Sequence, residues 1–400
     1  MVPGMNGGRR LDDYLCLGFA PDWERAQAYL RGLLAHDTAP EAPGTALCRV
    51  MEEHCHARRA PRPVLLLSGG LDSRLLLGAF LATRPRTDLL GLTFGTEDLP
   101  DVRIARRTCR RLGVEHRVLD PNTVVWDLDE IAARAVALNR KTGALPPVDA
   151  LVMYEELRRA AGAGATVISG YLGDALSGKH LPEAPVKTET EAAAAFRRAN
   201  RAFRTAANPS GVDRRLVAFL RSSSGLLEGW PGACLYDLLD IGLRQALRIR
   251  AVTGDAFEDC VRPYEDRRWV ACWLRREGVR DREQRAYRAF CREAFPKTFA
   301  LPPPERRAPR RGWQRLIPAF LRAPQPILNR ENRGDPARNA SLRSVYAALL
   351  ADLDRRGVLG EPALPLLETA LRNPDRRAFR RLRWAASAAL YLRVGLIAAE

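Results

Sequence analysis

The chain has 400 residues, of which 46% are hydrophobic and 28% are charged, so it suits one large or two moderate globular domains. No apolar signal segment opens it, and the stretch at 384–399 is too short, and too interrupted by Arg393, for a membrane span. The net charge of +17 permits a nucleic-acid partner, but the arginines are scattered along helical faces, so none is predicted. Eight cysteines without a CxxC pair indicate reduced thiols and a cytoplasmic protein.

Apolar runs alternate with amphipathic stretches through the first half of the chain, which predicts a doubly wound parallel sheet of the α/β class. Beyond Gly178 the pattern changes to Ala/Arg/Leu-rich helical segments, and no further strong strand is expected. The predicted strands lie at 64–67, 88–94, 114–119 and 166–169, and the predicted helices at 11–19, 23–34, 45–59, 101–112 (ended by Gly113), 127–139 and 149–161.

The hexapeptide Ser68-Gly69-Gly70-Leu71-Asp72-Ser73 joins the first predicted strand to the helix that follows it. The two glycines let the backbone approach an anion, and the serine hydroxyls and the first N–H groups of the helix add hydrogen-bond donors. A strand, a glycine-rich turn and a helix N-terminus in this order can hold a phosphate. Because the Asp72 carboxylate would repel a polyphosphate, the motif predicts Mg²⁺ between them. The alternative is a Gly-Gly turn capped by Asp or Ser.

A second glycine-rich segment, Ser169-Gly170-Tyr171-Leu172-Gly173-Asp174-Ala175-Leu176-Ser177-Gly178, follows the strand at 166–169. The carboxyl ends of parallel strands meet at one edge of a sheet, so Asp174 is expected to approach Asp72. Two carboxylates could then hold Mg²⁺ across the phosphates. A strand-to-helix turn with an N-capping aspartate is the alternative.

The first motif resembles the pyrophosphate loop of the ATP-pyrophosphatase superfamily, whose members split ATP between the α- and β-phosphates to adenylate a substrate. It lacks the Gly-Lys-Ser/Thr ending of the kinase-type P-loop. The second motif is similar to the second signature of the asparagine synthetase family, and Leu92-Thr93-Phe94-Gly95 fits the same pattern. A looser likeness at 257–266 extends the resemblance over about residues 60–290. It implies the HUP-like, PP-loop version of the doubly wound fold, with a largely helical C-terminal part.

The resemblance implies ATP and Mg²⁺ as the ligands of this site. By position, Asp72 and Asp174 would hold Mg²⁺, whereas His116, in a helix-to-strand connection, is expected to be structural. The residues that would bind the pyrophosphate or border the adenosine are Leu67, Ser68, Gly69, Gly70, Asp72, Ser73, Thr93, Phe94, Ser169 and Gly170.

Three departures from the family pattern affect the expected chemistry. The usual N-terminal glutaminase domain with its cysteine nucleophile is not expected, because residue 2 is Val and only about 60 residues precede the loop. The usual Asp-Glu pair is Asp174-Ala175. The late lysine that steadies the acyl-adenylate has no clear match. Lys297 is assigned this role, and Arg306 or Arg307 is the alternative, which would supply charge but stay protonated.

Tyr171 occupies a position where asparagine synthetases carry Glu and the β-lactam-forming relatives carry Tyr. In those relatives the tyrosine pairs with a distant carboxylate that takes a proton from the attacking amine. Tyr171 would do so here with Asp240 or Asp237 as a general base. A Tyr171 that only walls the nucleotide pocket is an equal alternative.

These observations predict a ligase that adenylates a carboxylate with release of pyrophosphate and then transfers the acyl group to an amine or ammonia with release of AMP. The carboxylate would be aspartate or an acid of a natural product or peptide, and a separate glutaminase or pathway partner could assist. The predicted organisation is a helical segment at 1–60, the ATP-pyrophosphatase domain at 61–290 and a helical extension at 291–400. The alternatives are a tRNA-modifying ATP pyrophosphatase and a degenerate nucleotide-binding partner protein.

Overall fold

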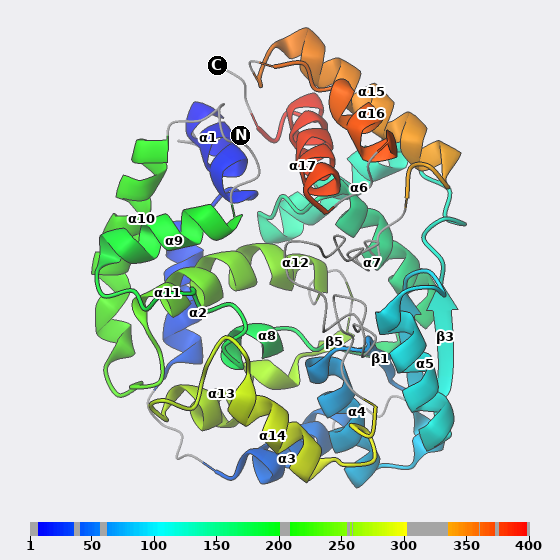
Figure 1. Cartoon of the computed structure of the whole chain (residues 1–400), viewed down its shortest axis with the longest axis vertical. Helices are drawn as coiled ribbons and strands as arrows, with labels where there is room; N and C mark the ends of the chain where they lie inside the picture. Colours follow the sequence, from blue (N-terminus) through cyan, green and yellow to red (C-terminus); the bar gives the residue numbers. More distant parts are fainter. Residues whose placement is uncertain are drawn as a thin grey trace, which may run out of the picture.

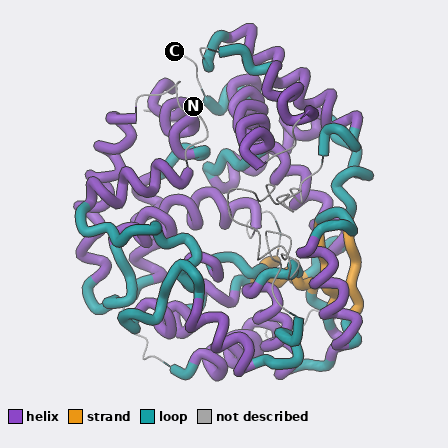
Figure 2. The backbone as a smooth tube through the Cα atoms, in the orientation of Figure 1, coloured by secondary structure: helices purple, strands orange, loops and turns teal. Residues whose placement is uncertain are grey.

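The computed structural model of the chain describes residues 7–35, 41–56, 62–200, 209–253, 257, 259–301, 335–359, 361–372 and 376–397. In these residues the strands lie on one side of the molecule and helices make up most of the rest (Figures 1 and 2). No helix in the described ranges is long and apolar enough to cross a membrane.

Five parallel strands form one sheet, in the order β3-β2-β1-β4-β5. In the register of the central strand β1, Val64 pairs with Leu90 of β2 on one side and with Val167 of β4 on the other. From β1 the chain adds β2 and then β3 on one side of β1, and it then adds β4 and β5 on the other side. The strand order therefore reverses between β1 and β4. The loops after these two strands therefore flank the crevice where open α/β sheets bind ligands. The strands are β1 (Val64–Leu66), β2 (Leu90–Phe94), β3 (Glu115–Leu119), β4 (Thr166–Ile168) and β5 (Asp259–Val261).

Helices cover both faces of this sheet, which confirms the predicted doubly wound α/β class. On one face, Leu65 shares a core cluster with Leu75 of α4 (Leu71–Thr83) and Cys109 of α5 (Pro100–Leu112). On the other face, Val64 packs in a separate cluster with Leu157 of α7 (Val148–Ala161). Successive residues of β1 thus enter different cores, as the pleat of a strand requires.

The predicted elements of the first half agree with the structure to within a few residues. Gly113 ends α5 in the left-handed conformation, with φ of 68°, as expected for a glycine that closes a helix. The expectation that no strand follows the second motif is wrong, because residues 259–261 form β5 beside β4. This edge strand has only three residues and begins with a charged one, so it shows no alternating pattern in the sequence.

The rest of the described chain is helical, which confirms the expected C-terminal part. A π-helix, Asp240–Ile249, follows α11, and three short 3₁₀ helices lie at Arg86–Asp88, Ser224–Leu227 and Pro263–Glu265. The remaining helices are α1 (Gly7–Leu17), α2 (Trp23–Leu33), α3 (Pro43–His56), α6 (Leu128–Thr142), α8 (Gly173–Leu176), α9 (Glu189–Asn200), α10 (Pro209–Ser223), α11 (Leu235–Leu239), α12 (Arg250–Thr253), α13 (Arg267–Leu274), α14 (Arg285–Ala294), α15 (Ala340–Arg356), α16 (Pro365–Arg372) and α17 (Arg376–Arg393).

A second large core lies away from the sheet, at the top of Figure 1, where α15, α16 and α17 pack with α1, α6 and α7. Trp384 and Leu390 of α17 are buried in this core. At the end of α1, Leu15 belongs to this core and Leu17 to the core that contains α4. The N-terminal helix therefore packs in both.

Candidate active site

The loop between β1 and α4, residues 67–70, is closed by its own serine hydroxyls. The Ser68 amide donates to Ser73 Oγ over 2.9 Å, and Ser73 Oγ donates to the Ser68 carbonyl over 3.1 Å. The Gly70 amide donates to Ser68 Oγ over 3.1 Å. A Cβ at Gly69 would lie 3.0 Å from the Asp101 backbone, so the turn packs tightly on the start of α5. The first motif thus forms the turn that leads into the N-terminus of α4.

The second motif runs directly along the first. A Cβ at Gly170 would lie 3.5 Å from the Ser73 nitrogen, and one at Gly173 would lie 2.5 Å from Asp72 Cγ. Between these glycines, Leu172 has a φ of 75°, in the left-handed region that residues other than glycine seldom adopt. This strained turn presses the backbone against Asp72, as sites that require close approach often do.

The structure brings Asp72 and Asp174 together at the ends of β1 and β4. Enclosure by the protein and the neighbouring charge of Asp174 raise the pKa of Asp72 well above its ordinary value. Enclosure would also raise the pKa of Asp174, but the positive charges of Lys179 and His180 outweigh it, so this pKa is lowered. The two pKa values therefore move in opposite directions, with Asp72 as the member that holds a proton more readily.

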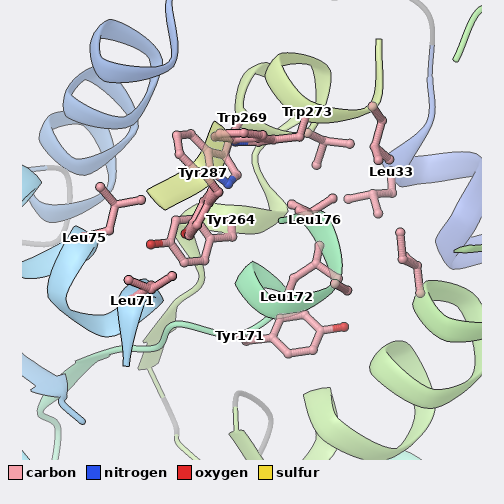
Figure 3. Close-up of a cluster of buried hydrophobic side chains, with 14 of the residues drawn as sticks. Leu33, Leu71, Leu75, Tyr171, Leu172, Leu176, Tyr264, Trp269, Trp273 and Tyr287 are labelled. Atoms are coloured by element: carbon pink, nitrogen blue, oxygen red, sulfur yellow. The ribbon is translucent and has the colours of Figure 1, made fainter. Parts of the chain in front are cut away.

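Two buried tyrosines fix Asp72 from the other side. Tyr287 of α14 donates to Asp72 Oδ1 over 2.7 Å, and Tyr264 donates to the Asp72 backbone carbonyl, also over 2.7 Å. Figure 3 shows both tyrosines between Leu71 of α4 and the pair formed by Trp269 and Trp273. An aromatic cluster from outside the two motifs therefore holds the carboxylate in place.

Lys179 binds the second carboxylate. Its Nζ lies 2.8 and 2.7 Å from the two oxygens of Asp174. Its amide also donates to the Asp174 carbonyl over 3.1 Å, so the turn at 174–179 sets the position of this side chain. The sequence does not single out Lys179, although it is one of only four lysines and lies just beyond the motif.

The residues predicted to border the adenosine lie at the carboxyl ends of β1, β2 and β4. Thr93 Oγ1 donates to the Leu67 carbonyl over 2.7 Å and lies 2.8 Å from His116 Nε2. Burial, with the charge of Arg106, lowers the pKa of His116 to about 4, so this histidine is neutral at neutral pH. Leu67, Thr93, Phe94 and Ser169 are all buried.

Tyr171 is also buried, and its hydroxyl meets a different partner from the one expected. The Tyr171 hydroxyl lies 3.2 Å from that of Tyr29 in α2, which donates to Glu265 Oε1 over 2.9 Å. Because the single proton of Tyr29 goes to Glu265, Tyr171 is the donor in its bond to Tyr29. Arg250 and Arg262 both bind Glu265. In Figure 3 the Tyr171 hydroxyl points away from Leu71.

The carboxylates considered as partners of Tyr171 have other contacts. Asp240 binds His180 Nδ1 over 3.0 Å and forms an ion pair with Arg244. Burial would raise the pKa of Asp240, but the charges of Arg244 and His180 bring it to about 2. Asp237 forms a buried ion pair with Arg280, with a 2.6 Å contact. None of the described contacts joins either carboxylate to Tyr171.

Lys297 is exposed, and the described contacts do not connect it to Asp72 or Asp174. The neighbouring Phe295 packs on Gly78, in the second half of α4 rather than at its N-terminus. The alternatives Arg306 and Arg307 lie outside the described residues.

Sequence patterns could have found some of the missed residues but not others. Tyr264 lies in the weak likeness at 257–266, at the position of the family's Phe, and Lys179 follows Asp174 by five residues. By contrast, Tyr29 and Tyr287 lie in ordinary amphipathic helices far from either motif, and only the packing of those helices reveals their role.

The two loops and the two carboxylates are the groups that could receive a phosphate ligand and a cation. Two carboxylates meet beside a helix N-terminus and a tight glycine-rich loop. They fall short of a cluster of three or more metal-binding side chains, and no such cluster is found among the described residues. Mg²⁺ suits such a site, because it usually takes one or two carboxylates together with substrate phosphates and water.

Comparison with known proteins agrees with this geometry. Residues 52–225 match the family model described as asparagine synthase. A search of curated proteins returned no match. The matched segment contains both loops, Asp72, Asp174, Tyr171 and Lys179, whereas Glu265, Tyr287 and Lys297 lie beyond it. Over residues 52–225, therefore, this chain is similar to the asparagine synthase family.

Proposed function

We propose that this protein is an ATP-dependent ligase that adenylates a carboxylate, releases pyrophosphate and transfers the acyl group to an amine or ammonia. The observation that carries the proposal is the meeting of Asp72 and Asp174 beside the 67–70 loop, at the point where the strand order reverses. The family match supports amide-bond synthesis driven by ATP. The acid would be aspartate or an acid of a natural product or peptide.

Residues of the two loops would carry out the first half of the proposed reaction. The substrate carboxylate attacks the α-phosphate of ATP, the bond to the bridging oxygen breaks, and pyrophosphate leaves. The 67–70 loop and the first N–H groups of α4 would hold the pyrophosphate. Asp72 and Asp174 would hold Mg²⁺, which when bound neutralises the charge that develops on the leaving group.

The second half requires a group that accepts a proton from the attacking amine. Tyr171 is the candidate from the family pattern, but burial raises its pKa well above the ordinary value, and the negative charge of Glu265 adds to this. Tyr171 can accept a proton only if its own proton leaves. The chain Tyr171–Tyr29–Glu265 provides a route, because each hydroxyl donates to the next member. We therefore propose Glu265, rather than Asp240 or Asp237, as the carboxylate that serves Tyr171.

A second candidate is a nucleotide-binding partner protein without turnover. Position 175, where the family carries a second acidic residue, holds an alanine that is 1% exposed and faces the core. Lys179 already binds Asp174. Both features reduce the number of carboxylates free to bind a metal.

Exchange of labelled pyrophosphate into ATP separates these candidates. The assay contains Mg²⁺ and a panel of acids: aspartate, other amino acids and peptide acids. We expect exchange with one class of acid, and we expect Asp72→Asn to abolish it while the fold is retained. Asp129→Asn is the matched control, because Asp129 is exposed at the start of α6, and it should exchange at the wild-type rate. Tight ATP binding without exchange for any acid would favour the second candidate.

A further inference from the structure

We propose that Lys179 is the protein's own cation for the phosphates, with an ammonium group that binds Asp174 and a phosphate oxygen of the ligand at the same time. The proposal rests on the function proposed above for the identity of the ligand. It assigns to Lys179 the positive charge that the family pattern had assigned to a late lysine.

The donors of Lys179 are only partly used. An ammonium group has three N–H donors, and the described contacts direct two of them to the Asp174 oxygens, at 2.8 and 2.7 Å. The side chain is 37% exposed, so part of it faces open space rather than protein. One donor therefore remains for an acceptor that approaches from that side.

The position of Lys179 is fixed by its turn. Its amide donates to the Asp174 carbonyl over 3.1 Å, and Ser177 Oγ donates to the same carbonyl over 3.1 Å. Gly178 has a φ of 92°, and a Cβ there would lie 2.7 Å from the Asp281 carbonyl oxygen. Only glycine fits this point, so the turn has little freedom to carry Lys179 away. A cation held in place before the ligand arrives loses less entropy on binding.

The charges around the loop also favour this role. Asp174 brings a negative charge to a site that must accept phosphates, and no second acidic residue is present at position 175 to recruit more metal. Lys179 offsets the Asp174 charge without a metal. Lys297, in contrast, is exposed and has no described contact with either carboxylate.

Binding of pyrophosphate and ATP in the presence of EDTA tests the proposal without metal and without turnover. Isothermal titration calorimetry would compare the wild type with Lys179→Gln. We expect the variant to bind pyrophosphate about 10- to 100-fold more weakly, as for the loss of one hydrogen bond to a charged group. Lys187→Gln is the matched control, because Lys187 is exposed on the same connection, and it should bind like the wild type.

Two further variants identify the source of the loss. In Lys179→Gln the Asp174 charge is left uncompensated and could by itself repel the phosphates. The double variant Lys179→Gln/Asp174→Asn removes that charge, so recovery of wild-type affinity would overturn direct contact. Continued weak binding supports it. A loss of binding in Lys297→Gln with none in Lys179→Gln would overturn the assignment to Lys179.

A measurement on the wild type does not depend on how the variants fold. The chain has only four lysines, so incorporation of lysine labelled with ¹³C at Cε gives few NMR signals and leaves the ammonium groups unmodified. We expect the Lys179 signal to shift when pyrophosphate is added, and a shift confined to the other signals would contradict the proposal. If exchange succeeds but Lys179→Gln binds normally, the inference fails and the function stands. If pyrophosphate binding depends on Lys179 but no acid supports exchange, the inference about Lys179 stands and the proposed function fails.

Discussion

Asp72 is held by contacts from three parts of the chain. Tyr287 binds its carboxylate, Tyr264 binds its carbonyl, Asp174 lies beside it, and the Gly173 backbone packs against its side chain. Each contact limits where the Asp72 carboxylate can lie relative to the 67–70 loop. A carboxylate with so little freedom is suited to hold a cation at a fixed point, since small displacements of a catalytic group reduce rates strongly.

Gly173→Ala tests this restriction directly. The added Cβ would lie 2.5 Å from Asp72 Cγ, so the Asp72 side chain or the second loop must move. We expect pyrophosphate exchange to fall by about 10²-fold and the free energy of unfolding to fall by about 1–3 kcal/mol. Exchange assays and urea denaturation would measure the two effects.

Gly225→Ala is the matched control for this substitution. A Cβ at Gly225 would meet no atom within 4 Å, so its stability should change by less than about 0.5 kcal/mol and its activity should be normal. Wild-type exchange in Gly173→Ala would show that the contact with Gly173 does not position Asp72.

Arg74 supports the 67–70 loop from inside the protein. This arginine is fully buried; its Nε donates to the Gly70 carbonyl over 3.1 Å and its Nη1 donates to the Leu301 carbonyl over 2.7 Å. Burial lowers its pKa to about 10, so the group is still charged at neutral pH. A buried positive charge at the base of the loop favours an anion above it. The sequence shows Arg74 only as one residue of a helix.

At the scale of elements, hydrophobic periodicity predicts the strands and helices correctly where the pattern extends over several residues. The strands at 88–94 and 114–119 and the helix at 101–112 follow regular patterns, and the structure agrees with them. The two glycine-rich segments were also recognisable, because their order after a strand has a physical meaning. β5 and the contacts of Tyr29 and Tyr287 were not, since they depend on which elements pack together rather than on local pattern.

The contact between α2 and the second loop gives a prediction for the amine step. Tyr29 of α2 links Tyr171 to Glu265, and Tyr29→Phe removes that link but keeps the ring. If the proton of the amine leaves through this chain, amide formation should slow by about 10- to 100-fold while pyrophosphate exchange stays within about twofold. Single-turnover measurement of both half-reactions would detect the difference.

Tyr171→Phe provides the comparison, since it breaks the chain at its first member. It should show the same selective loss of amide formation as Tyr29→Phe. Equal and normal rates of both half-reactions in the two variants would assign Tyr171 to the packing of the pocket wall. Equal loss of both half-reactions would indicate a general disturbance of the second loop.

At the scale of the whole molecule, the C-terminal helices are tied to the sheet through α7. Leu151 of α7 packs in the core with α15 and α17, whereas Leu157 of the same helix packs against the sheet. α1 makes a similar link, because Leu15 and Leu17 lie in different cores. Shared helices of this kind transmit a loss of packing from one core to the other. The C-terminal helices are therefore expected to unfold together with the domain that carries the site.

Leu390→Ala tests this coupling. Leu390 of α17 is 0% exposed, and its truncation should lower the free energy of unfolding by about 2–5 kcal/mol. Leu364→Ala is the matched control at a leucine that is 41% exposed, and it should have less than about a quarter of that effect. Urea denaturation followed by tryptophan fluorescence, far-UV circular dichroism and pyrophosphate binding should give one transition that shifts as a whole. If pyrophosphate binding persisted at urea concentrations where the helical signal of the variant had already fallen, the C-terminal helices would be a separate unit. The extension predicted at 291–400 would then be thermodynamically independent of the site, and the shared packing of α1 and α7 would be too weak to join them.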